Sequence, residues 1–230
     1  MYNIKKLNKR IINLFNYKLK KFFYLHHYSQ RNLNFNWEKT NQLRIKVINN
    51  LINKTKDKRY LEIGCDLNQV FNKIKAKSKI GVDPIRGGNR RCTSDNFFKK
   101  NTKKFDVIFI DGLHEYNQIR KDVINSLKYL DKNGYIIIHD LFPRNWLEEH
   151  VPRLNSTWCG DVWKISFDLL KSKNIKFELL LIDFGLGVVT KKKENITLYK
   201  NNYESKNFDF FANNYKKLPL VKIKKTSKYI

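Results

Sequence analysis

Residues 105–116 read FDVIFIDGLHEY, and this stretch decides the fold. Its apolar run from Val107 to Ile110 is typical of a strand that is buried on both faces of a parallel sheet. The run ends at Asp111, and His114 follows just before a segment with helical spacing. Because ligands of open α/β sheets bind beyond the carboxyl ends of the strands, we expect Asp111 and His114 to face a ligand.

Similar apolar runs on both sides of this stretch predict further strands at residues 59–63, 79–82 and 135–138, and each ends beside an acid. Residues 177–182 and 186–190 are typical of a hairpin. Capping residues and helical spacing predict helices near residues 40–53, 70–74, 94–98, 119–130 and 161–173. The pattern predicts an α/β fold, a doubly wound, Rossmann-like, mostly parallel sheet with helices on both faces and a C-terminal antiparallel hairpin.

The length of 230 residues suits one such domain, over residues 31–190, with a segment on either side. Residues 1–30 contain no acid and place apolar residues at helical spacing among lysines, which predicts a basic amphipathic helix. This helix either packs its apolar stripe on the domain or makes a peripheral contact with an anionic membrane surface or a partner. Residues 191–230 form a Lys/Asn-rich tail that we expect to be partly disordered or to lie on the surface.

The composition limits the class of protein further. A net charge of +26 invites a nucleic-acid interpretation, but the lysines are spread along the whole chain, which favours a compositional bias over a phosphate-binding patch. The three cysteines form no CxxC pair, which fits a reducing cytoplasm. No secretory signal and no apolar run of roughly 20 residues is found. We therefore expect a cytoplasmic protein, with attachment to the inner face of a membrane as the alternative that the N-terminal helix leaves open.

The turn after the first strand narrows the choice of ligand. A dinucleotide-binding site is typically marked by the pattern G-x-G-x-x-G. This turn instead carries one glycine, Gly64, between the carboxylates of Glu62 and Asp66. These carboxylates would repel a pyrophosphate. A cofactor with an ammonium group, a ribose and a cationic centre, such as S-adenosylmethionine, suits this acidic rim, and Asp83 at the end of the second strand can accept from both ribose hydroxyls.

At these residues the sequence resembles the class I S-adenosylmethionine-dependent methyltransferases, in particular their small-molecule and sugar O-methyltransferase branch. The motif I-D-G-x-H-x-Y of that branch is matched by residues 110–116, and GVDP at residues 81–84 also matches. In the first turn, Asp66 and Asn68 stand where the family has its second and third glycines. Because Asp and Asn tolerate a left-handed backbone, we expect the turn to be retained.

The resemblance implies an active enzyme with cofactor-binding residues at the strand ends. The methionine end would be lined by Glu62, Gly64 and Asp66, the ribose held by Asp83, and the adenine would lie near Ser94 and Asp95, with Asp111 linking cofactor and acceptor. Each of these residues also has an ordinary structural interpretation: Gly64 as a turn, Asp83 as the end of a strand, Ser94 as a helix cap.

Methyl transfer to a hydroxyl requires a positioned acceptor and a group that removes its proton. His114 is the candidate base, because an imidazole accepts a proton near neutral pH, and the alternative is that it caps the following helix. Some relatives bind Mg²⁺ through acids at positions that correspond to Asp111 and Asp140, whereas His139 replaces a third acid. The site therefore holds Mg²⁺, holds another divalent metal that accepts imidazole, or holds none, with His139 as a second base or a core residue.

Aromatic and polar residues after the last parallel strand are candidates for the acceptor pocket, because stacked rings beside polar groups suit sugars. They are Arg144, Trp146, Trp158, Asp161 and Trp163. The alternative is that these tryptophans pack in the core and in a lid. The leading hypothesis is a methyltransferase that O-methylates a small polar acceptor such as a sugar or glycan precursor. The second hypothesis is a non-catalytic Rossmann-like binding module that its basic tails tether to a membrane or to nucleic acid.

Overall fold

The computed structural model describes residues 18–19, 22, 30–40, 43–200 and 202–229. The basic helix expected over residues 1–30 lies almost wholly outside the described residues, so its proposed membrane contact stays a prediction, as does the cytoplasmic location. None of the helices in the described ranges combines the length and the apolar character that a membrane crossing requires.

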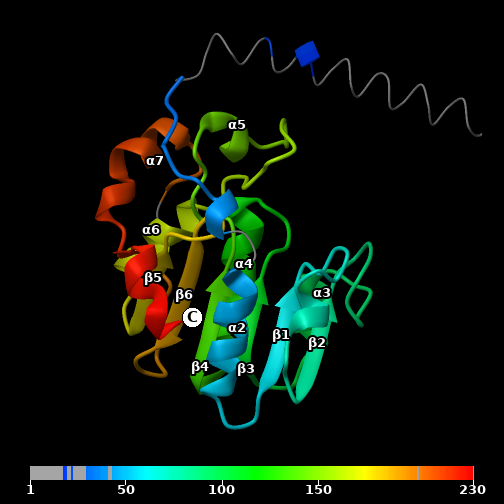
Figure 1. Cartoon of the computed structure of the whole chain (residues 1–230). Helices are drawn as coiled ribbons and strands as arrows, with labels where there is room; N and C mark the ends of the chain where they lie inside the picture. Colours follow the sequence, from blue (N-terminus) through cyan, green and yellow to red (C-terminus); the bar gives the residue numbers. More distant parts are fainter. Residues whose placement is uncertain (1–17, 20–21, 23–29, 41–42, 201, 230) are drawn as a thin grey trace, which may run out of the picture.

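Seven strands form one sheet in the order β2-β1-β3-β4-β6-β5-β7 (Figure 1). Their bounds are β1 Arg59–Ile63, β2 Ser78–Val82, β3 Phe105–Ile110, β4 Leu130–Ile138, β5 Ile175–Leu180, β6 Leu186–Lys191 and β7 Leu220–Val221. The first four strands are parallel, β6 is antiparallel to both β4 and β5, and β7 is parallel to β5. The predicted mostly parallel sheet and its antiparallel hairpin are confirmed.

The centre of the sheet explains the apolar run that opened the sequence. All six residues of β3 are buried, because the strand lies between β1 and β4 with helices over both of its faces. The chain leaves β1 toward β2 on one side and returns to β3 on the other, so the order of strands reverses between β1 and β3. A reversal of this kind opens a crevice at the carboxyl ends of the strands.

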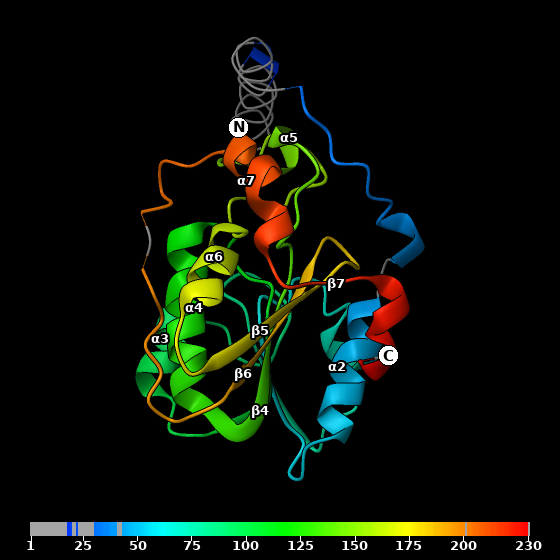
Figure 2. The ribbon, with the colours of Figure 1, turned by 90° about the vertical axis from the view of Figure 1, so that its left-hand side faces the viewer.

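Helices cover the two faces of the sheet in separate layers. Figure 2 shows α2 on one side and α4 with α6 on the other. The helix α4 turns an apolar stripe of Ile119, Val123 and Leu127 toward the sheet, as the sequence predicted. The helical bounds are η1 Glu38–Thr40, α2 Leu43–Asn53, η2 Phe71–Lys73, α3 Ser94–Lys100, α4 Tyr116–Tyr129, α5 Trp146–Glu149, α6 Lys164–Lys171, α7 Phe208–Asn214, η3 Tyr215–Lys217 and η4 Ile223–Lys228.

One local prediction is met only in part and one is wrong. The helix expected near residues 70–74 is the single 3₁₀ turn η2, because positive φ angles at Asp66 and Asn68 leave a short run of helical backbone before Ile74 becomes extended. The helix α3 is capped by Thr93, whose hydroxyl accepts a hydrogen bond from the backbone N–H of Asn96 at 3.3 Å, and not by Ser94.

The C-terminal segment differs from the surface tail that its lysines and asparagines suggested. Phe208 and Phe211 of α7 are fully buried, and Phe211 packs against Trp163 and Phe142 with ring centroids 5.2 and 5.1 Å apart. The chain then adds β7 to the edge of the sheet. The aromatic residues spaced among the lysines dock this segment, so the domain extends well past residue 190.

Candidate active site

The carboxyl ends of β1, β2, β3 and β4 surround a cavity of about 750 Å³. Its lining contains seven carboxylates, a third of the 21 acids in a chain whose net charge is +26. A cavity lined in this way favours a cationic ligand. It brings together eleven residues that were predicted from the sequence: Glu62, Gly64, Asp66, Asp83, Ser94, Asp95, Asp111, His114, His139, Asp140 and Trp158.

The turn after β1 approaches the end of β3 so closely that only glycine fits at position 64. Gly64 has a φ of 85°, and a Cβ atom there would lie 2.1 Å from the carbonyl oxygen of Asp111. Asp66 and Asn68 adopt φ angles of 42° and 61°, in the left-handed region that these two residue types tolerate. The turn therefore keeps its left-handed backbone without the second and third glycines of the family pattern.

Asp83 connects the turn after β1 to the loop after β2 through hydrogen bonds, a role that its place at the end of β2 did not reveal. One carboxylate oxygen accepts from the backbone N–H groups of Cys65 and Asp66 at 3.1 and 3.0 Å. The other accepts from those of Ile85 and Arg86 at 2.8 and 2.9 Å. The four backbone donors hold the pKa of Asp83 below its ordinary value although burial acts in the opposite direction. A ribose bound by Asp83 would have to share or replace these donors.

Ser94 and Asp95 begin α3 and line the cavity beside α4. The hydroxyl of Ser94 accepts a hydrogen bond from Nε2 of Gln118 at 3.1 Å, and the same nitrogen lies 3.3 Å from a carboxylate oxygen of Asp95. Gln118 also donates to Asp122, whose pKa burial raises to about 6. These polar groups, on α3 and α4, form a wall that can accept and donate hydrogen bonds.

Glu62 is almost fully buried in β1 beneath the turn, with 1% of its surface exposed. Burial raises its pKa to about 8, against a hydrogen bond of 2.5 Å from the hydroxyl of Tyr60, and the charge of Asp111 adds to the increase. The side chain is therefore a neutral carboxylic acid at pH 7 in the free protein. A cation placed beside it would favour its ionised form.

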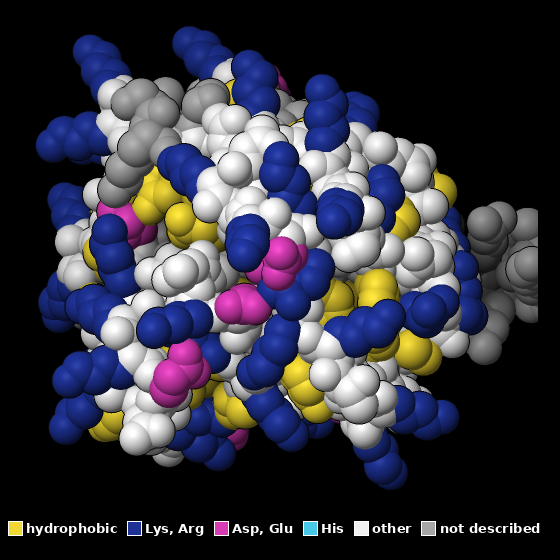
Figure 3. All heavy atoms as spheres, turned by 90° about the horizontal axis from the view of Figure 1, so that it is seen from below, with side chains coloured by type: hydrophobic (Ala, Val, Ile, Leu, Met, Phe, Trp, Pro, Cys, Tyr) yellow, Lys and Arg dark blue, Asp and Glu magenta, His cyan; other side chains and the backbone are white. Residues whose placement is uncertain are grey.

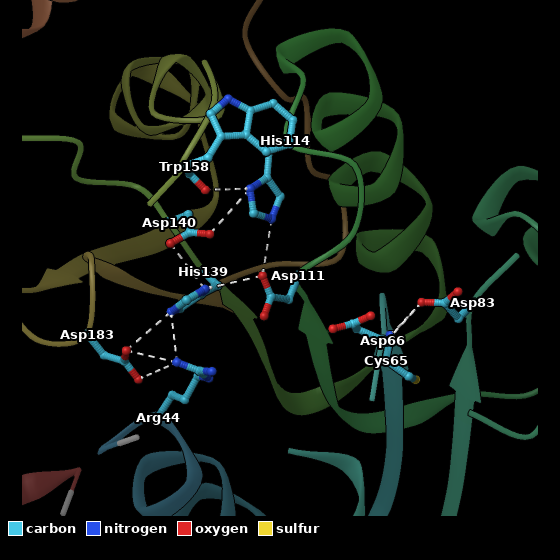
Figure 4. Close-up of polar contacts among 10 residues, drawn as sticks. All are labelled: Arg44, Cys65, Asp66, Asp83, Asp111, His114, His139, Asp140, Trp158 and Asp183. Carbon is cyan, nitrogen blue, oxygen red and sulfur yellow. Dashed lines mark hydrogen bonds and ion pairs between the residues drawn. The ribbon is translucent and has the colours of Figure 1, made fainter. Parts of the chain in front are cut away.

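His114 lines the cavity and is held on three sides (Figure 4). Its Nε2 atom is 3.4 Å from Asp111, and its Nδ1 atom is 3.4 Å from Asp140 and 3.1 Å from the carbonyl oxygen of Trp158. The Trp158 ring stacks on the imidazole with centroids 5.0 Å apart. Gly160 permits this approach, because a Cβ atom there would lie 1.9 Å from the carbonyl oxygen of His114.

The carboxylates control the protonation of this imidazole. Burial acts to lower the pKa of His114, but the charges of Asp140 and Asp111 outweigh burial and raise that pKa above its ordinary value. In return the positive charges of His139 and His114 hold the pKa of Asp111 well below its ordinary value, in spite of its burial. The free site therefore favours an imidazolium–carboxylate pair.

His139 connects this group to a second ion pair that the sequence did not predict. Its Nδ1 atom is 3.2 Å from Asp111 and 3.3 Å from Asp140, and its Nε2 atom is 3.6 Å from Asp183. Arg44 donates to both carboxylate oxygens of Asp183 at 2.8 Å (Figure 4). Asp183 is fully buried in the turn between β5 and β6, so it fixes one edge of the His139 ring while the other edge faces the cavity.

The side chains of Asp111, His139 and Asp140 fit the ligand set of a metal ion. Each offers one ligand atom, and these atoms all lie within 4.8 Å of one another. One imidazole nitrogen and two carboxylate oxygens suit a divalent ion that accepts both nitrogen and oxygen.

Four residues that were predicted to contact the acceptor lie outside the cavity lining. Trp146 and Trp163 are 3% and 0% exposed because they pack in the core. Arg144 pairs with Glu148 at the start of α5. Asp161 accepts from the backbone N–H of Tyr116 at 2.6 Å and pairs with Lys164. Among the tryptophans, the alternative of core packing is therefore correct for these two, and Trp158 alone of the five candidates faces the cavity.

Three residues of the site were missed. Arg44 and Arg153 line the cavity, and Asp183 holds His139 from behind. Arg153 sits over the face of Trp158, with its guanidinium carbon 5.9 Å from the ring centroid. Asp183 follows the strand predicted at residues 177–182, but it was interpreted only as part of the hairpin turn. Arg44 and Arg153 stand beside no predicted strand end, so no local signal identified them.

The fold and the site together are typical of α/β proteins that bind a ligand at the strand ends. The domain is doubly wound, its cavity is lined with acids, and a histidine lies between two carboxylates. A family model described as a methyltransferase domain matches residues 26–141, which is half of the chain. An uncharacterized protein of Acanthamoeba polyphaga mimivirus is 27% identical over 155 residues, covering 51% of this chain and 67% of that protein.

The solved structures to which this chain shows similarity include two methyltransferases. The SAH-bound Podospora anserina methyltransferase PaMTH1 is 21% identical, with a TM-score of 0.47 and coverage of 64% of this chain and 76% of its own. The O-methyltransferase TomG of Streptomyces achromogenes, in complex with SAM, is 12% identical, with a TM-score of 0.46 and coverage of 65% and 80%.

The chain belongs to the family of methyltransferase domains that matches residues 26–141. The resemblance to class I S-adenosylmethionine-dependent methyltransferases that the sequence predicted is confirmed.

Proposed function

We propose that this domain transfers the methyl group of S-adenosylmethionine to a hydroxyl of a small polar acceptor, such as a sugar or glycan precursor. The observation that carries the proposal is the position of His114, which lies in the cavity between Asp111 and Asp140 and stacks on Trp158. An imidazole so placed can take a proton from an acceptor hydroxyl. The Trp158 ring, beside Arg153, offers the kind of surface on which polar rings stack.

The cofactor would occupy the side of the cavity formed by the turn after β1. Asp66 provides negative charge for its ammonium group, and Glu62, neutral in the free protein, would ionise beside that group. Ser94 and Asp95 provide hydrogen-bonding groups for its adenine. The cofactor, when bound, would supply an electrophilic methyl group and would leave as a neutral thioether. His114 is placed to take the proton of the acceptor hydroxyl whose oxygen would accept that methyl group. Because this step needs the neutral imidazole, positive charge bound beside Asp111 and Asp140 assists it by lowering the pKa of His114.

The cluster of Asp111, His139 and Asp140 would hold a divalent cation as part of this site. Its one nitrogen and two oxygen ligands favour Mn²⁺ or Zn²⁺ over Mg²⁺, which prefers oxygen ligands alone. Such an ion, when bound, supplies positive charge that orients an acceptor hydroxyl and lowers its pKa. Calorimetric titration with Mn²⁺ should show binding that Asp140→Asn abolishes and that Asp95→Asn, in the same cavity but outside the cluster, retains. Equal binding by both variants would contradict the assignment.

Calorimetry with S-adenosylmethionine tests the cofactor, and methyl uptake from labelled cofactor by a panel of sugars and nucleotide-sugars tests the acceptor. His114→Ala should abolish turnover while the dissociation constant for the cofactor changes by less than about threefold, since His114 contacts the acceptor side. The matched control is His150→Asn, outside the cavity lining, which should keep both. Absence of cofactor binding at millimolar concentration would favour the non-catalytic binding module instead.

A further inference from the structure

The end of the sheet opposite the active site gathers bases that are scattered in the sequence. The pairings Arg59 with Ser78, Phe105 with Leu130 and Ile175 with Lys191 bring the starts of five strands and the end of β6 to one edge. Here we define the basal face by the six segments at this edge: residues 54–59, 75–79, 99–104, 128–132, 173–176 and 191–193. They contain 18 of the 47 lysines and arginines of the chain but only two of its 21 acids.

Figure 3 views the molecule from this end, and dark blue Lys and Arg side chains are spread over the whole described face, with fewer acidic and hydrophobic groups between them. The acids at this end pair with only a few of its bases. Lys176 and Lys191 pair with Glu178 and Glu194 just outside the six segments. Arg59 pairs with Asp57 and Asp131, the two acids of the basal face, and with the buried Asp106. Exposed lysines such as Lys103 and Lys132 have no acidic partner in the part of the chain that the structure describes. The face therefore carries uncompensated positive charge.

The shape of the basal face helps to choose its partner. Beside the edge strand β2 it contains a hollow of about 410 Å³, whose lining includes Lys79, Arg90, Lys103 and Lys104 together with the neutral donor Asn89. None of the large hydrophobic residues that the structure records as exposed in its described ranges lies in the six segments. A membrane surface is flat and usually engages apolar anchors as well as bases, whereas a chain of phosphates can follow a recessed row of donors.

We propose that the basal face binds the phosphate backbone of a nucleic acid without reading its sequence. Nearly all of its bases are lysines, which contact phosphate as point charges, and the active-site cavity opens at the opposite end, so both ligands can be bound at once. The even spread of lysines along the sequence argued against such a partner. The strand register removes that objection, because it collects the scattered lysines on one face.

The test compares two variants with the same net charge. The basal variant changes Lys77, Lys100, Lys103 and Lys132 to Gln, and the control variant changes four other exposed lysines, Lys46, Lys216, Lys224 and Lys225, to Gln. Fluorescence anisotropy with a labelled single-stranded 20-nucleotide RNA measures affinity over a range of salt concentrations, with the full chain in every case. Circular dichroism checks that each variant is folded.

The basal variant should bind roughly tenfold more weakly than the wild type at about 100 mM salt, and the control variant less than about threefold more weakly. The salt dependence should also fall, by about 0.7 in the slope of log K against log salt for each phosphate that the variant no longer neutralises. Equal weakening of the two variants would show that net charge alone governs binding and would overturn the proposal. Binding of the wild type to phosphatidylserine vesicles but not to RNA would overturn it as well.

Discussion

Replacement of Glu62 by Gln should change how the stability of the protein depends on pH. The carboxyl group of Glu62 has an ordinary pKa of 4.5 and a pKa of about 8 in the folded protein, raised chiefly by burial. Between these values the folded protein holds a proton that the unfolded chain has released. Because the unfolded state binds fewer protons there, the free energy of unfolding falls as pH rises, and the stability that the neutral acid contributes is lost above pH 4.5.

The size of the effect follows from the two pKa values. One pH unit corresponds to about 1.4 kcal/mol for a fully exchanged proton, so Glu62 lowers the free energy of unfolding by about 2.5 kcal/mol between about pH 5.5 and 7.5. Glu62→Gln keeps the hydrogen-bonding shape of the neutral acid and cannot ionise. The difference in the free energy of unfolding between the variant and the wild type should therefore change by about 2.5 kcal/mol in favour of the variant over that range.

Urea denaturation at the two pH values, followed by circular dichroism, measures the effect, with the exposed residue change Glu115→Gln as the control. A second readout comes from the cofactor. If its ammonium group binds beside Glu62, the acid should ionise and release up to about 0.9 proton at pH 7, measurable by calorimetry in buffers with different ionisation enthalpies. Parallel stability curves for Glu62→Gln and the wild type would refute the reasoning.

Two further changes test the framework of the site. Gly64→Ala should lower the free energy of unfolding by about 3 kcal/mol in urea denaturation, because its Cβ atom would meet the backbone of Asp111 and its φ is positive; a fully stable variant would contradict the close approach. Asp183→Asn should lower the free energy of unfolding by about 3 kcal/mol in the same assay, because it leaves Arg44 without its buried charged partner. The control Asp57→Asn removes a mostly exposed partner of Arg59 and should lower the free energy of unfolding by less than about 0.5 kcal/mol. If Asp57→Asn and Asp183→Asn lowered it equally, the buried ion pair of Asp183 would have no special role.

The sequence predicted those parts of the fold that local patterns determine. The strand at residues 105–110 is a continuous apolar run because both of its faces are covered, and the polar residues at its end, Asp111 and His114, lie in the cavity as expected. The sequence pattern at residues 70–74 alone could not distinguish a longer α-helix after β1 from a single helical turn. The left-handed turn that precedes it decides between a helix and the single turn η2.

Contacts between distant parts of the chain could not be predicted. Arg44 and Asp183 are 139 residues apart, and each looks like an ordinary helix or turn residue until the fold joins them. Trp158 and Trp163 are close in sequence, yet one stacks on His114 in the cavity and the other is fully buried in the core. Only the path of the chain after β4 separates these two environments.

The acids gathered around the cavity have a consequence for the kinetics of cofactor association. Judged by its net charge of +26, the molecule should repel a cationic ligand at long range. In the cavity the six carboxylates other than the neutral Glu62 outnumber the four basic side chains of Arg44, Arg153, His114 and His139, so the local field attracts cations at short range. An approaching cation therefore crosses from a repulsive region into an attractive one. Salt screens the distant repulsion more strongly than the attraction inside the cavity. Added salt should therefore increase the association rate of a cationic cofactor, opposite to the usual behaviour of a protein whose acidic site steers a cation.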